Sequence, residues 1–180
     1  LKSTIAALEA ENEAAKTSAR SAAEATLRRA AMTRVQTALD TGASFAAAAA
    51  ELSDLGVSVP DILSQNAANG VTSLASLQES FPDAARAALT ADREAASEAG
   101  ETGGLSGFLR SQLGARSLTP QEGDSTDAVL SRAEAALREG RLADTLAELE
   151  TLPEVAHPAM SAWAELASAR ASAVNAAQTL

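Results

Sequence analysis

The sequence is poor in the residues that most often carry chemistry. It has no cysteine, no tyrosine, one histidine and one tryptophan among 180 residues. Without cysteine there is no disulfide, no zinc–thiolate site and no thiol nucleophile. A single histidine, His157, cannot build a multi-histidine metal site, and its place before Pro158 is typical of a residue at the start of a helix. No nucleophile elbow, phosphate-binding loop or metalloprotease motif occurs. We therefore expect no enzyme, no catalytic residue, no metal and no cofactor.

Long apolar runs and excess positive charge are also missing. No run is long enough for a transmembrane helix, and no signal peptide is present. The chain opens at Leu1 without Met, so we expect a piece of a longer protein. The formal net charge of −10 excludes nucleic acid as a partner, because phosphate binding needs a basic surface. Any contact with an anionic membrane has to be local.

The chain is rich in alanine. Hydrophobic residues make up 46% of the sequence, but aromatic residues only 2%. Alanine is the best helix former, yet it buries little apolar area. We therefore predict an all-α fold, in which the end of a coiled coil leads into helical hairpins and a C-terminal three-helix unit. Such thin cores would depend on neighbouring helices or on self-association.

Residues 1–41 predict one long helix, since no glycine or proline precedes Gly42. Its first part fits a heptad with Ile5 and Asn12 at position a and Leu8 at position d. An asparagine at position a can fix the register and the number of strands of a coiled coil. We therefore predict that Ile5, Leu8 and Asn12 take part in oligomerisation, with the coiled coil ending near residue 29. Large apolar residues are absent from the seam after Leu8, so a solvated, alanine-rich surface helix fits the same pattern.

Two stretches about a hundred residues apart share a sequence pattern, called here the repeated phrase. Both ALDTGASFAAAAAELSDLG, residues 38–56, and ALREGRLADTLAELETLP, residues 136–153, contain Ala-Leu, two polar residues, Gly and then Glu-Leu-x-x-Leu. A glycine just past a helix end favours a tight reversal. Each phrase therefore predicts a helical hairpin.

The remaining glycines, prolines and polar stretches predict the domain organisation. A helical hairpin region covers 42–100, in which Pro82 is expected to begin a new helix. Residues 101–124 form a hinge, an amphipathic segment and a polar loop, and 125–180 form the C-terminal domain. Trp163 is expected to anchor the core of that domain together with two leucines, Leu137 and Leu149.

Residues 105–118 contain no Asp or Glu in an otherwise acidic chain. On a helix they would combine one apolar side with basic borders, and we predict a lipid-binding role for Leu105, Phe108, Leu109, Arg110, Leu113 and Arg116. An interfacial helix needs apolar side chains for the acyl boundary and cations for the phosphates of anionic lipids. A core helix docked on the hairpins would use the same stripe, and on pattern alone it is the commoner case.

The C-terminal region also carries a family resemblance. Residues 128–173 contain Ala133-Glu134-Ala135-Ala136-Leu137, Gly140, Leu142, Ala147-Glu148-Leu149, Leu152-Pro153, and Trp163 followed by Ala169-Arg170. This pattern resembles the mitofilin domain, in particular that of alphaproteobacterial proteins. The resemblance implies an inner-membrane protein with a transmembrane helix, a coiled coil, a lipid-binding region and this domain at its end. That family shapes crista junctions in mitochondria and intracytoplasmic membranes in bacteria.

The resemblance implies that residues 105–118 fall where the family's lipid-binding region lies, which favours the membrane interpretation over the core helix. We therefore expect a non-enzymatic, homo-oligomeric, membrane-organising protein that binds anionic lipids. Its expected place is the periplasmic side of a bacterial inner membrane, or the mitochondrial intermembrane space in a eukaryote, where other envelope proteins are candidate partners. The alternative is a helical-hairpin interaction scaffold without direct lipid contact.

Overall fold

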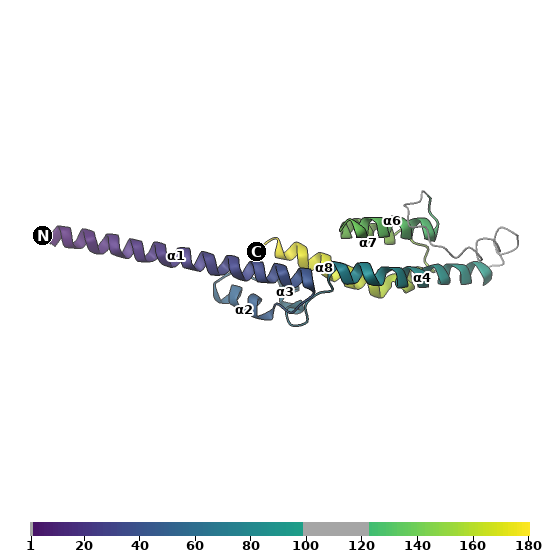
Figure 1. Cartoon of the computed structure of the whole chain (residues 1–180), viewed down its shortest axis with the longest axis horizontal. Helices are drawn as coiled ribbons and strands as arrows, with labels where there is room; N and C mark the ends of the chain where they lie inside the picture. Colours follow the sequence, from purple (N-terminus) through teal and green to yellow (C-terminus); the bar gives the residue numbers. More distant parts are fainter. Residues whose placement is uncertain (1, 99–122) are drawn as a thin grey trace. The chain divides into compact units, whose positions relative to one another are not determined.

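The computed structural model describes residues 2–98 and 123–180 (Figure 1). Its helices are α1 (Lys2–Thr41), α2 (Ala46–Asp54), α3 (Asp61–Asn66), α4 (Leu74–Glu98), α6 (Thr126–Arg138), α7 (Leu142–Leu149) and α8 (His157–Ala177). No strand occurs in these two ranges. The all-α prediction is therefore confirmed.

The chain divides into two compact units. The first contains Leu1–Gly70 and Ala173–Leu180, and the second contains Val71–Ser172. Most of α8 belongs to the second unit and its last turn to the first. This division differs from the segments expected from the sequence, because the region 42–100 is split after Gly70 and α4 joins the C-terminal helices.

In the first unit, α2 packs on the carboxyl half of α1 and on α3. Val35 and Leu39 of α1 are buried, as is Leu52 of α2. Arg28 of α1 donates from Nε and Nη2 to the carbonyl oxygen of Leu55, at 3.1 and 2.6 Å. Leu55 is the C-cap of α2, so this arginine satisfies a carbonyl that the helix leaves without a partner and places a cation near the negative end of the helix dipole.

In the second unit, α6 packs against both α4 and α7. One apolar core joins these helices to α8. Its larger members are Leu77, Phe81 and Leu89 from α4, Val129, Leu130 and Leu137 from α6, Leu149 from α7, and Met160 and Trp163 from α8. Alanines fill the places between them, so the helices approach closely.

Trp163 connects α8 to α4 in two ways. Its ring meets Phe81 edge-on, with centroids 5.0 Å apart and an interplanar angle of 80°. Its Nε1 donates to the carbonyl oxygen of Leu77 at 3.0 Å. Trp163 is 4% exposed, and Leu137 and Leu149 are buried in the same core. The indole thus supplies apolar area and keeps its own polar atom satisfied.

The two repeated phrases form the same turn. Gly42 and Gly140 have φ of 79° and 75°, a left-handed conformation that suits glycine. The amide after each glycine donates to a carbonyl five positions earlier, from Ala43 to Ala38 at 3.0 Å and from Arg141 to Ala136 at 2.9 Å. This is the Schellman pattern of a helix end. Each turn joins two helices that pack together, α1 with α2 and α6 with α7.

Helix α4 continues through Pro82, so the prediction of a new helix starting there is wrong. A proline inside a helix removes one hydrogen bond and costs about 3 kcal/mol. Leu77 and Phe81 precede the proline, Ala85 and Leu89 follow it, and all four are buried in one core at i, i+4 spacing. Burying each large apolar side chain contributes about 1.5–3 kcal/mol, which outweighs the cost of the proline.

Replacing Trp163 by alanine should lower the free energy of unfolding by about 3–5 kcal/mol, because a large cavity opens beside Phe81. Leu166→Ala is the matched control, since Leu166 lies on the same helix and is 48% exposed. The control should change stability by about 0.5 kcal/mol or less. Chemical denaturation followed by circular dichroism measures both variants, and equal losses would contradict the anchoring role of Trp163.

Candidate functional site

The predicted lipid-binding residues lie outside the part of the chain that the structure describes: Leu105, Phe108, Leu109, Arg110, Leu113 and Arg116. Their role therefore stays a prediction. Among the helices that are described, none combines the length and apolar character needed to cross a bilayer. Two surfaces remain as candidate sites, the amino half of α1 in the first unit and a groove in the second unit.

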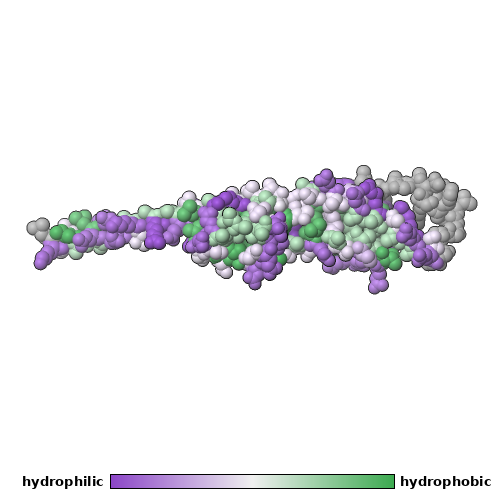
Figure 2. All heavy atoms as spheres, turned by 90° about the horizontal axis from the view of Figure 1, so that it is seen from below, coloured by the Kyte–Doolittle hydropathy of each residue, from purple (hydrophilic) through white to green (hydrophobic). Residues whose placement is uncertain are grey.

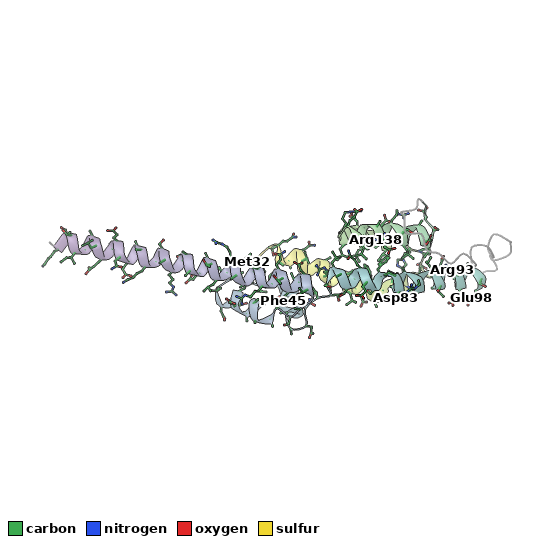
Figure 3. The ribbon with its side chains drawn as sticks, viewed as in Figure 1. Met32, Phe45, Asp83, Arg93, Glu98 and Arg138 are labelled. Carbon is green, nitrogen blue, oxygen red and sulfur yellow. The ribbon has the colours of Figure 1, made fainter. Side chains whose placement is uncertain are left out.

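The amino half of α1 is exposed on all sides. Every residue from Lys2 to Ala23 is exposed, and the first buried residue of this helix is Ala31. Figure 3 shows the side chains of this part projecting away from the helix on every side. The predicted oligomerisation residues Ile5 and Leu8 are 51% and 61% exposed. In Figure 2, hydrophobic residues lie at the surface near the start of α1, among hydrophilic ones.

Local ion pairs support this part of α1 only weakly. Lys16 contacts Glu13 at 2.8 Å and Arg20 contacts Glu24 at 3.0 Å, all on exposed side chains. Such pairs contribute about 0.3–0.5 kcal/mol each. An isolated helix is marginal in water, and most helical stability in proteins comes from packing of an apolar face. The seam formed by Ile5, Leu8 and Asn12 has no partner among the described residues.

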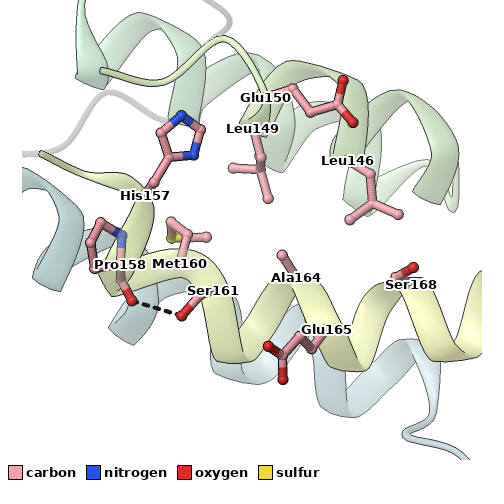
Figure 4. Close-up of a pocket in the computed structure, with 10 residues that line it drawn as sticks. All are labelled: Leu146, Leu149, Glu150, His157, Pro158, Met160, Ser161, Ala164, Glu165 and Ser168. Atoms are coloured by element: carbon pink, nitrogen blue, oxygen red, sulfur yellow. Dashed lines mark hydrogen bonds between the residues drawn. The ribbon is translucent and has the colours of Figure 1, made fainter. Parts of the chain in front are cut away.

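A groove of about 640 Å³ lies between α7 and α8 of the second unit (Figure 4). Leu146 and Leu149 point from α7 toward Met160 and Ala164 of α8. Leu149 and Met160 are buried, while Leu146 and Ala164 are partly exposed. The groove exists because Ala164 presents only a methyl group to α7, so no large side chain fills the space between the helices. Its floor is therefore apolar and open to solvent.

Two carboxylates border the groove. Glu150 follows α7 and Glu165 lies on α8, and both side chains are exposed. Neither carboxylate makes a hydrogen bond or ion pair with a described residue, and no described lysine or arginine lines the groove. His157 lies at one end, where Ser161 donates its hydroxyl to the carbonyl of Pro158 at 2.9 Å (Figure 4). The edge of the groove therefore carries two negative charges that no described residue of the second unit pairs with.

Three other acidic residues in or near α7 are paired with arginines. Arg132 contacts Glu148 at 2.9 Å across the α6–α7 hairpin. Arg141 bonds Asp144 and also Glu139, the latter at 2.9 Å. The hydrogen bonds to Asp144 and Glu139 raise the pKa of Arg141 above its usual value, so this guanidinium stays charged. The negative charge at the groove thus comes from residues outside these pairs.

The arrangement offers apolar contact and negative charge to a ligand. Among the described residues, no group of three metal-ligating side chains is close enough to hold an ion. The hydroxyl of Ser161 is directed to a backbone carbonyl, and His157 makes no hydrogen bond to a described side chain. The groove thus presents an apolar floor bordered by two exposed carboxylates.

The sequence did not predict this groove. Leu149 was expected in the core, and Leu146 reads as part of the seam of the α6–α7 hairpin. The groove stays open because Ala164 has a small side chain. In a chain so rich in alanine, one more alanine does not indicate a groove. The i, i+3 pair of Leu146 and Leu149 indicates an apolar face but not which helix lies opposite.

No protein-family model, curated protein or solved structure matches the chain. The resemblance to the mitofilin domain therefore stays a prediction from the residues of the C-terminal region. In the structure, four of its positions are buried in the second unit and one forms the α6–α7 turn: Leu137, Leu149, Leu152, Trp163 and Gly140.

Proposed function

We propose that this chain is a non-enzymatic membrane-organising module that self-associates through α1 and contacts anionic lipids through residues 105–118. The observation that supports it is the exposed amino half of α1, which presents Ile5, Leu8 and Asn12 on one seam. The likeness of residues 128–173 to the mitofilin domain supports a place in that family, at the periplasmic side of an inner membrane.

Self-association gives the exposed helix a packing partner. In a parallel two-stranded coiled coil, Asn12 meets its counterpart at position a, while Ile5 and Leu8 become buried. Glu11 at position g then faces Lys16 at position e of the other helix, which is an attractive pair. Full burial of a large apolar side chain contributes about 1.5–3 kcal/mol. Two such residues per chain support a weak, reversible dimer.

A dimer also strengthens lipid contact. Each arginine near an anionic leaflet contributes about 1 kcal/mol, and shallow insertion of an apolar side chain gains only part of its full burial energy. One segment with Arg110 and Arg116 binds weakly when the whole chain carries a net charge of −10. Two or more linked segments bind the same membrane much more tightly through effective concentration.

The alternative function is a helical-hairpin scaffold that binds proteins without touching lipid. The groove between α7 and α8 favours it, because an open apolar floor with an acidic rim suits a protein partner. The two functions differ in their dependence on residues 105–118.

The double variant Phe108→Asp/Arg110→Glu should lose binding to vesicles of phosphatidylcholine and phosphatidylserine in co-sedimentation, because it removes an apolar contact and reverses one charge. The control Val155→Asp/Arg93→Glu changes the net charge equally, at exposed positions of the second unit. It should sediment like the parent chain. Unchanged binding of the first variant, or equal binding to pure phosphatidylcholine vesicles, would refute the lipid-contact proposal.

Because the chain has no cysteine, one introduced thiol reports on the helix seam. Ala15→Cys lies at position d and should give a disulfide-linked dimer under mild oxidation, since parallel, in-register helices bring equivalent d positions together. Thr17→Cys lies on the outer face of the same turn and should cross-link far less. Non-reducing electrophoresis and light scattering measure both. Equal cross-linking of the two variants, or a monomeric parent chain, counts against self-association through this seam.

A further inference from the structure

We infer that the groove between α7 and α8 binds a short amphipathic helix with basic flanks, supplied by a partner protein. This site is additional to the lipid and self-association surfaces proposed above and does not rest on them. Three features of the second unit carry the inference: the shape of the groove, its apolar floor, and the sign of the charge on its rim.

The shape of the groove suits a helix. The lining residues of α8 recur at helical spacing, from His157 through Ser161 and Ala164 to Ser168. At 1.5 Å per residue they extend along about 16 Å of the helix, or about three turns. The volume of about 640 Å³ falls within the range of ligand sites. An open trough of this length between two helices accepts the row of side chains that a third helix presents at i, i+3 and i+4.

The floor supplies the apolar contact. Leu146 and Ala164 are partly exposed, and Leu149 and Met160 belong to the buried core. Side chains of an incoming helix would cover these atoms and complete the packing that Ala164 leaves open. Methionine adapts to partners of different shape, because its side chain is unbranched and polarisable. The floor thus favours leucine-type anchors without demanding one particular sequence.

The rim determines the charge of the partner. Glu150 beside α7 and Glu165 on α8 are the two acidic residues that line the groove (Figure 4). A helix bound in the groove would lie near both carboxylates, and no described lysine or arginine lines the groove. Exposed pairs contribute only about 0.2–1 kcal/mol each. The two carboxylates therefore contribute more to specificity for a basic partner than to affinity. The same carboxylates disfavour an anionic lipid as occupant.

The test uses two fluorescein-labelled synthetic helical peptides and the full chain. Both peptides carry leucines at i, i+3, i+4 and i+7; one has lysine flanks and the other glutamate flanks. Fluorescence anisotropy should show binding of the lysine peptide and at least about tenfold weaker binding of the glutamate peptide. Absence of binding by the lysine peptide, or equal binding of both, overturns the inference.

Variants of the groove locate the binding. Glu150→Lys/Glu165→Lys should weaken the lysine peptide about five- to tenfold, which corresponds to two exposed charge pairs. The matched control is Glu79→Lys/Glu94→Lys, which makes the same charge change at exposed positions of α4. The control carries the same net charge, so an equal loss of binding there would show non-specific attraction and overturn the inference.

A neutral variant that blocks the groove separates the contribution of its shape to binding from that of its charge. Ala164→Gln places a longer side chain in the groove and should weaken the lysine peptide about tenfold, with helix content unchanged by circular dichroism. If Ala164→Gln loses helix content, Leu146→Gln on α7 is used as the blocking variant instead. Full binding by a folded blocking variant overturns the inference. The inference is also overturned if the blocking variant, without peptide, forms a smaller oligomer than the parent chain. In that case the groove is occupied by a second copy of this chain.

Discussion

The packing of Trp163 against Phe81 is the contact on which the second unit depends. The chain has three phenylalanines and one tryptophan, and two of these four rings meet between α4 and α8. The indole hydrogen bond to Leu77 joins positions 86 residues apart. Because α8 is held to α4 here and α7 is held by its hairpin with α6, both walls of the groove are fixed by contacts outside it.

The abundance of alanine explains both the close packing and the open surfaces. Alanines such as Ala133 and Ala167 are fully buried and let helices approach closely, but each contributes little apolar area. Where a large residue is absent, as at Ala164, the same composition leaves a groove. Along the amino half of α1 it leaves a helix with few large apolar side chains. The abundance of alanine thus accounts both for the closely packed cores and for these exposed surfaces.

Local signals were enough to predict part of the fold. Gly42 and Gly140 mark the two Schellman turns because only a left-handed residue fits there, and Trp163 was predicted as a core anchor from its size. Pro82 misled the prediction, since its local cost is outweighed by packing on helices that come much later in the chain. The groove also depends on tertiary packing. It is set by the distance between α7 and α8, which the sequence of neither helix specifies alone.

The signs of the charges allow two kinds of contact by one chain. Residues 105–118 have arginines and no carboxylate, which suits an anionic bilayer, whereas Glu150 and Glu165 repel such a surface and attract a basic helix. A ligand that fits one surface is therefore disfavoured at the other. If both proposals hold, opposite charges select the two ligands, and a membrane would not compete with a protein partner for the groove. On these two proposals, a chain with a net charge of −10 would bind a protein partner at Glu150 and Glu165 while Arg110 and Arg116 contact lipid.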